Sequence, residues 1–168
     1  MNRIIVDAHI LIKFVQNDMK FINTQISTLN EKVEKKYVIT IDNRGFVETE
    51  CIQSYNPVDV TRVWISQKEK VGKIRRIKPY PLEKTDIKPL LNKYGFPRND
   101  ILYINLANSI PRRYIISEDM DFYDPKSKNV CQKTKTRIIN NRAGKLCKYL
   151  KKEFKIIVAN IYNANNEL

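Results

Sequence analysis

The sequence predicts an α/β fold: a three-layer sandwich in which helices flank a central parallel sheet of four to five strands. Two observations support it. Four short runs rich in Ile, Val and Tyr are almost continuously apolar, which is typical of strands buried on both faces of a parallel sheet. Helical periodicity lies between these runs, and strands that alternate with helices form such sheets. At 168 residues, the chain fits one domain over residues 1–168.

The strand-like runs cover residues 3–6, 37–41, 113–116 and 155–159. Between the first two, apolar residues spaced four, three and four apart mark one face of a helix; they are Ile22, Ile26, Leu29 and Val33. A mostly buried helix is expected over residues 100–109, with Asn99 as its N-cap. One more helix should precede the last strand, with its apolar face formed by Ile139, Leu146, Leu150 and Phe154.

The segment 53–98 is the least regular part of the chain. We expect a helix over residues 60–67, followed by a basic run, a turn-rich segment and a short helix over residues 86–94. The basic run reads KEKVGKIRRIKP. We interpret residues around 55–98 as a basic insertion in the domain.

The chain is strongly basic, with 31 Lys and Arg against 18 Asp and Glu, or a net charge of +13. Such a surplus attracts polyanions and favours a nucleic-acid partner, although a binding module would share it. The three cysteines form neither a disulfide framework nor a zinc pattern. The sequence shows no signal peptide and no long apolar run, so we expect a cytoplasmic protein that does not bind a membrane.

Acidic residues stand where parallel strands end and where helices begin. These positions share one edge of an α/β sheet, so the side chains should meet there. They are Asp7 after the first strand, Glu48 and Glu50 after the second, Asp100 at the start of the buried helix, and Asp119 and Asp121 after the third strand.

Several carboxylates so close together would repel one another, and a divalent cation removes that repulsion. Mg²⁺ and Mn²⁺ take oxygen ligands. Either ion can activate water and stabilise charge on a phosphate. An acidic site in a basic protein therefore predicts a metal-dependent nuclease.

These motifs, in this order, resemble those of the PIN-domain ribonucleases. The first is IIVDAHILI with Asp7, the second GFVETE, the third NDILYINLAN with Asp100, and the fourth YIISEDMDF with Ser117 and Asp119. The resemblance implies an endoribonuclease that acts on RNA with Mg²⁺ or Mn²⁺. It also implies two kinds of protein partner, an acidic antitoxin-like protein and a second copy of the chain.

The resemblance assigns catalysis to Asp7, Glu48, Asp100 and Asp119, with Asp121 as a further metal ligand. Glu48 is preferred over Glu50, since only one of two residues two apart can face the site. Glu50 and the hydroxyl of Ser117 are expected to support the ligands. His9, the only histidine, could contact a phosphate or act as a base.

The densest basic run in the middle of the chain is the candidate RNA-binding surface. Tyr80 follows it and could stack on a base. The basic residues are Lys68, Lys70, Lys73, Arg75, Arg76 and Lys78.

Two other classes of function stay open. Ala8 and His9 stand where the family has Ser or Thr and a polar residue, which favours a decayed nuclease that only binds RNA or protein. A DNA nuclease with a related acidic site is the second alternative.

Overall fold

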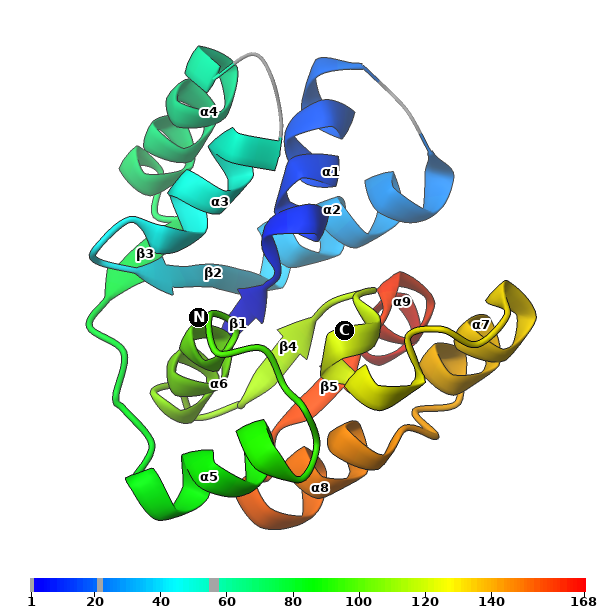
Figure 1. Cartoon of the computed structure of the whole chain (residues 1–168). Coiled ribbons are helices and arrows are strands. Elements are labelled where there is room, and N and C mark those ends of the chain that lie inside the picture. The colour runs from blue at the N-terminus through cyan, green and yellow to red at the C-terminus, as the bar shows by residue number, and fades with distance from the viewer. Residues whose placement is uncertain (1, 21–22, 55–57) are drawn as a thin grey trace.

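The computed structural model describes residues 2–20, 23–54 and 58–168. In these residues one sheet holds five parallel strands in the order β3-β2-β1-β4-β5 (Figure 1). The predicted α/β fold with a parallel sheet is therefore confirmed. The strands are β1 (Asn2–Val6), β2 (Tyr37–Asp42), β3 (Ile74–Ile77), β4 (Tyr114–Ile116) and β5 (Ile157–Ala159).

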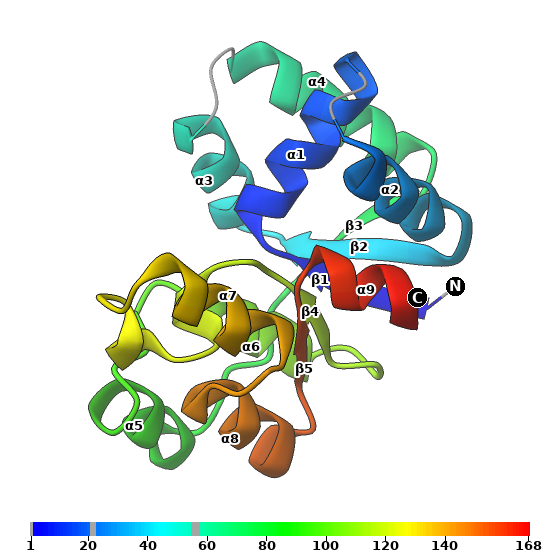
Figure 2. The ribbon, with the colours of Figure 1, turned by 90° about the vertical axis from the view of Figure 1, so that its right-hand side faces the viewer.

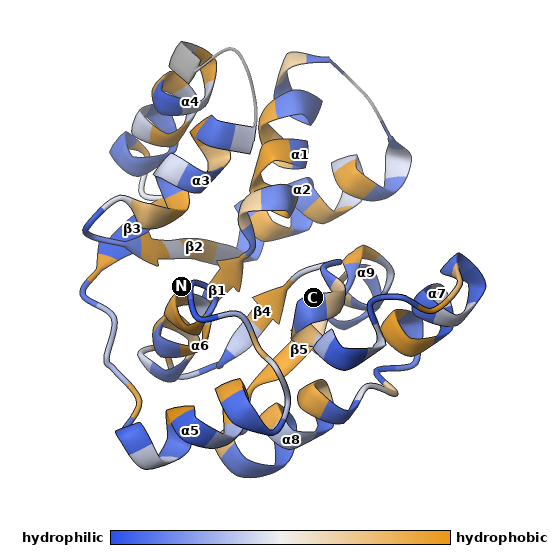
Figure 3. Cartoon of the chain, viewed as in Figure 1, coloured by the Kyte–Doolittle hydropathy of each residue, from blue (hydrophilic) through white to orange (hydrophobic). Residues whose placement is uncertain are grey.

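The sheet is buried on both faces near its centre, because β1 and β4 carry apolar side chains on both sides. Ile4, Ile5 and Val6 are fully buried, and so are Ile115 and Ile116. Figure 3 shows β1, β4 and β5 as largely hydrophobic, with hydrophilic residues on the outer helices. The continuous apolar runs in the sequence reflect this burial.

Helices cover both faces of the sheet. Helices α1 to α4 lie on one side, and α5, α6 and α8 lie on the other (Figures 1 and 2). Their bounds are α1 (Ala8–Met19), α2 (Thr24–Lys36), α3 (Phe46–Ser54), α4 (Val58–Lys70), α5 (Lys84–Asn92), α6 (Ile101–Asn108), α7 (Gln132–Asn140), α8 (Lys145–Phe154) and α9 (Ile161–Glu167), with short 3₁₀ turns η1 (Met120–Phe122) and η2 (Pro125–Ser127).

Three details differ from the sequence prediction. Strand β3 lies inside the stretch interpreted as a basic insertion, so part of that stretch belongs to the sheet. The single helix expected before the last strand is two helices, α7 and α8, because the chain turns between them at Arg142, which has φ 50°. Asp100, not Asn99, is the N-cap of α6. Ile22, expected on the apolar face of α2, lies outside the described residues.

The strand order places a topological switch point between β1 and β4. From β1 the sheet continues through β2 to β3 on one side, and from β4 to β5 on the other. Ligands of doubly wound sheets bind in the crevice beyond the carboxyl ends of the strands at such a point. The residues that follow β1 and β4, Asp7 and Ser117, are the first candidates for function.

Across the residues that the structure describes, the helices are all too short or too polar to span a membrane. All three cysteines carry free thiols; Cys51 and Cys147 are buried and Cys131 is exposed.

Candidate functional site

Asp7 stands at the switch point and is almost completely buried, with 2% of its surface exposed. Its backbone N–H donates to the carbonyl of Ile116 at 3.0 Å, which fixes the end of β1 against the end of β4. Its side chain makes no capping hydrogen bond to α1. The carboxylate therefore does not cap the helix, although Asp before a helix is usually a cap.

Ser117 holds the Asp7 carboxylate in place. The buried hydroxyl of Ser117 donates to Oδ2 of Asp7 at 2.6 Å and accepts from the backbone N–H of Asp119 at 3.0 Å. One hydroxyl thus links the acids that follow β1 and β4. This is the orienting contact that the sequence analysis expected of Ser117.

Glu50, not Glu48, faces Asp7, so the preference for Glu48 is corrected. Both lie on α3, whose start is fixed because the Asp42 side chain accepts from the backbone N–H groups of Phe46 and Val47. Because α3 begins at this point, the Glu48 side chain does not face Asp7. Its Oε2 atom lies 2.7 Å from Nη2 of Arg76, which belongs to β3. Strand β3, which the sequence did not predict, thus supplies the cationic partner of Glu48.

Tyr103 of α6 is a site residue that sequence reasoning also missed. Its buried hydroxyl donates to Oε2 of Glu50 at 2.6 Å and accepts from the backbone N–H of Ala8 at 3.2 Å. It thus links α6 to α3 and to the start of α1. In the sequence Tyr103 is one more large residue of a buried helix, and only its polar hydroxyl hints that it needs a partner.

Asp100, Asp119 and Asp121 surround the same space. Burial, together with the charges of Glu50, Asp119, Asp121 and Asp7, raises the pKa of Asp100 to about 7. Burial also raises the pKa of Glu50 and of Asp119, and nearby carboxylates add to both shifts. The acids from four separate segments therefore lie close enough to oppose one another's ionisation.

Lys128 partly neutralises this cluster. Its ammonium lies 2.6 Å from Oδ1 of the buried Asp121. The charges of Asp121, Asp119 and Asp100 help to raise the pKa of Lys128, so it stays protonated beside the acids. The carboxylate of Asp121, predicted as a metal ligand, thus already has a cationic partner.

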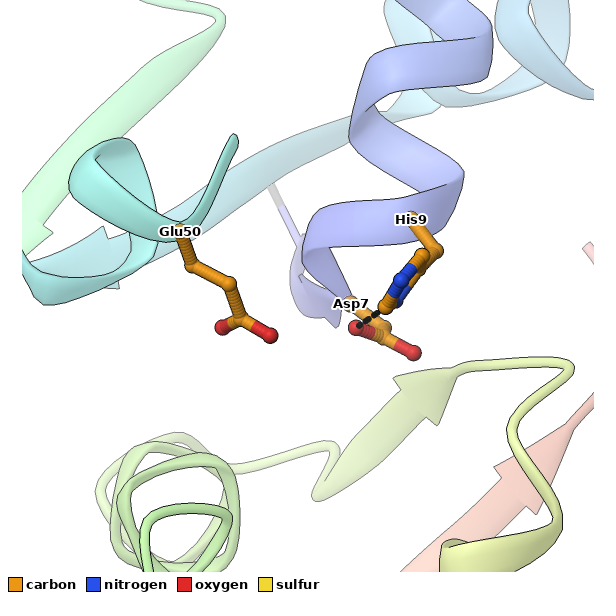
Figure 4. Close-up of side chains that lie close together, drawn as sticks. All are labelled: Asp7, His9 and Glu50. Atoms are coloured by element: carbon orange, nitrogen blue, oxygen red, sulfur yellow. Dashed lines mark ion pairs between the residues drawn. The ribbon is translucent and has the colours of Figure 1, made fainter. Parts of the chain in front are cut away.

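His9 lies beside Asp7 at the open side of the cluster. Its Nδ1 is 3.8 Å from Oδ1 of Asp7, and this contact is the main reason that the pKa of His9 is raised. Figure 4 shows the Glu50 carboxylate pointing from α3 towards Asp7 and His9. One ligand atom from each of these three residues lies within 4.8 Å of the others. Carboxylate oxygens and an imidazole nitrogen suit a divalent ion such as Mn²⁺.

The predicted RNA-binding run is divided between internal ion pairs and solvent. Lys68 pairs with Asp18 at 3.0 Å and also with Glu34, while Arg76 pairs with Glu48 and Glu69. Lys73 donates to the carbonyl of Glu34. The side chains left on the surface are Lys70, Arg75 and Lys78, with Tyr80 beyond them at 66% exposure.

The pKa of Asp100 gives a prediction about stability. Because its folded-state pKa of about 7 lies above the ordinary 3.8, the folded chain binds more protons between these pH values, and the free energy of unfolding falls as pH rises through this window. Because Asn cannot ionise, Asp100→Asn removes this fall in the free energy of unfolding. In EDTA at pH 8, we expect the variant to be more stable by about 1–2 kcal/mol, after allowance for solvent screening of a partly exposed group.

Urea unfolding at pH 4 and pH 8 measures this effect. The advantage of Asp100→Asn should shrink towards pH 4, where both residues are neutral. An advantage that is equal at both pH values, or absent at both, would show that the Asp100 carboxyl does not titrate in a crowded acidic site.

Comparison with protein-family models, with curated proteins and with solved structures found no match to this chain.

Proposed function

We propose that the protein is an endoribonuclease that depends on a divalent metal ion. The observation that carries the proposal is the meeting of carboxylates from four elements at the switch point of the sheet. Asp7 follows β1, Glu50 lies on α3, Asp100 begins α6 and Asp119 follows β4. Their crowding costs stability, so a function that uses the charges is needed to explain it.

The carboxylate oxygens fit Mg²⁺ or Mn²⁺, and the imidazole nitrogen of His9 favours Mn²⁺, since Mg²⁺ takes oxygen ligands. Asp7, His9 and Glu50 are the residues that would hold the ion, since their ligand atoms are the closest together, and Asp119 and Asp100 border them. When bound, the ion supplies a water of lowered pKa and neutralises charge that develops on a phosphate. Ser117 and Tyr103 keep Asp7 and Glu50 oriented through hydrogen bonds of 2.6 Å each.

The chain's charge favours RNA or another polyanion as the substrate. The net charge of +13 draws a phosphate backbone to the protein's surface. Lys128 at the rim of the acidic cluster stands where it can shift from Asp121 to an incoming phosphate. The resemblance of the four acidic motifs to PIN-domain ribonucleases supports RNA over DNA.

A matched pair of glutamate variants tests the proposal. With a fluorescent single-stranded RNA and Mn²⁺, Glu50→Gln should lower the cleavage rate by about 100-fold or more, as expected when a metal ligand loses its charge. Glu48→Gln, two residues away, should stay within about threefold of the wild type, because its partner is Arg76 and not the site. EDTA should abolish the activity of the wild type. Equal rates for the two variants would contradict the assignment.

A basic RNA-binding module is the second candidate. It is favoured by the contacts that already engage two of the acids, namely Lys128 with Asp121 and Tyr103 with Glu50. Such a module would bind RNA without cutting it. Its RNA affinity would be the same in Mn²⁺ and in EDTA, whereas the nuclease should bind Mn²⁺ itself.

A further inference from the structure

A groove opens directly beside the acidic cluster, between α3 and the start of α6. Its volume is about 660 Å³, within the range of small-molecule sites. Glu50 and Asp100 belong both to its wall and to the cluster. A molecule held in the groove would therefore lie next to the carboxylates proposed to bind metal.

The wall from α3 is one face of that helix. Phe46, Thr49, Glu50 and Gln53 are spaced three, one and three apart, so their side chains share a face. Phe46 is the first residue of α3 and exposes 58% of its surface. A large exposed aromatic ring is common on its own, but a ring that lines a groove beside a charged site is a candidate for ligand contact.

The opposite wall offers hydrogen-bonding groups. It consists of Arg98 and Asn99 before α6, then Asp100, Ile101, Leu102 and Asn105. The side-chain oxygen of Asn105 accepts from the backbone N–H of Leu82 at 2.9 Å, which fixes the amide so that its NH₂ group remains to donate. The groove thus pairs an aromatic ring with amide and guanidinium groups.

We infer that this groove binds one base of a single-stranded RNA, next to the phosphate that is cut. The inference rests on the proposed nuclease function and names the part of the substrate that the site would recognise. Phe46 would stack on the base, and Asn99, Asn105 or Gln53 would meet its polar edge. Arg98 would contact a neighbouring phosphate.

The same geometry excludes a base that is paired in a duplex. A flat ring can stack on Phe46 only if the base leaves its own stack, and single-stranded segments provide such bases without that cost. Phe46 and Glu50 are one helical turn apart, which is close to the reach of a nucleotide from its base to its phosphate. The preference for single strands is thus a property of the groove and not of the metal ligands.

A fluorescent base tests the inference separately from catalysis. The probe is a hexaribonucleotide with one 2-aminopurine, whose fluorescence falls when it stacks. It is titrated in Mn²⁺ into proteins that all carry Asp119→Asn, so that it stays uncut. We expect Phe46→Ala to weaken binding by roughly 5- to 150-fold, the range for the loss of one stacking contact, and to remove the quenching. Phe46→Trp should retain both.

The matched control is Tyr162→Ala, which removes an equally exposed aromatic ring, also 58% exposed, from α9, outside the groove. It should leave binding and quenching unchanged. If Phe46→Ala binds and quenches like its parent, or if a duplex probe responds to Phe46 as strongly as the single strand, the groove is not a base site.

Cleavage by proteins without Asp119→Asn separates the two proposals. If the wild type cuts RNA and Phe46→Ala does not raise the KM, the proposal that the groove binds a base is wrong, whereas the proposed nuclease function is supported. Quenching that depends on Phe46 in a protein that cuts no RNA would support the base site and overturn the nuclease.

Discussion

Asp7→Asn should lower the rate of RNA cleavage in Mn²⁺ by at least about 100-fold, more than is usual for groups that only support a metal ligand. Asn has the shape of Asp and can still accept the hydroxyl of Ser117, so the buried position stays filled. What it removes is the negative charge at the centre of the cluster. In EDTA the variant should melt no lower than the wild type, because one source of repulsion is gone.

Asp86→Asn is the control for this prediction. Asp86 lies in the first turn of α5, on the other side of the sheet from α3, and the same change there should leave cleavage unaltered. If Asp7→Asn retains cleavage, or if it loses activity only because it melts well below the wild type, Asp7 is a structural residue and not a metal ligand.

Gly144→Ala should destabilise the fold by about 3 kcal/mol, at the upper end of the usual range for overpacking. A Cβ at Gly144 would lie 2.1 Å from the carbonyl oxygen of Tyr123, which is backbone and cannot rotate away. That carbonyl also accepts from the N–H groups of Leu146 and Cys147, at 3.0 and 3.2 Å. The first turn of α8 therefore has to move for the methyl group to fit.

Urea unfolding in EDTA measures the change. Lys145→Ala, at the next and exposed position, should stay within about 0.5 kcal/mol of the wild type. Tyr123 also donates its hydroxyl to the carbonyl of Ser117 at 2.9 Å, so Gly144→Ala should disturb the acidic loop and reduce cleavage as well. A variant as stable as the wild type would show that α8 does not approach Tyr123 so closely.

Much of the fold can be predicted from the sequence because burial leaves a direct pattern. The central strands are apolar on both faces, and α6 is buried on most sides. Strand β3 was not predicted because its sequence is IRRI: it lies at the sheet edge, where Arg75 is exposed and Arg76 pairs with Glu48 and Glu69. A short basic segment of this kind resembles a surface loop in sequence. Only its hydrogen-bonded pairing with β2 identifies it as a strand.

The sequence predicts which segments of the chain meet at the candidate site, but it does not predict in which direction each side chain points. Asp7 and Asp119 follow from the rule that parallel strands end at one edge, and Asp100 from the expectation that the helix it begins starts at that edge. The choice between Glu48 and Glu50 depends on where α3 begins, and that is fixed by the Asp42 side chain. The pairing of Glu48 with Arg76 joins residues 28 positions apart, which no local pattern contains.

The identity of the cleaved RNA ends tests the central claim most directly. Wild-type protein is incubated with a short RNA in Mn²⁺, and the fragments are weighed by mass spectrometry. Attack by water at the acidic site predicts fragments that carry a plain terminal phosphate and a hydroxyl, and no fragments at all in EDTA. Fragments that end in a 2′,3′-cyclic phosphate and persist in EDTA would contradict the account, since they require attack by the RNA's own 2′-hydroxyl, with His9 as the available base.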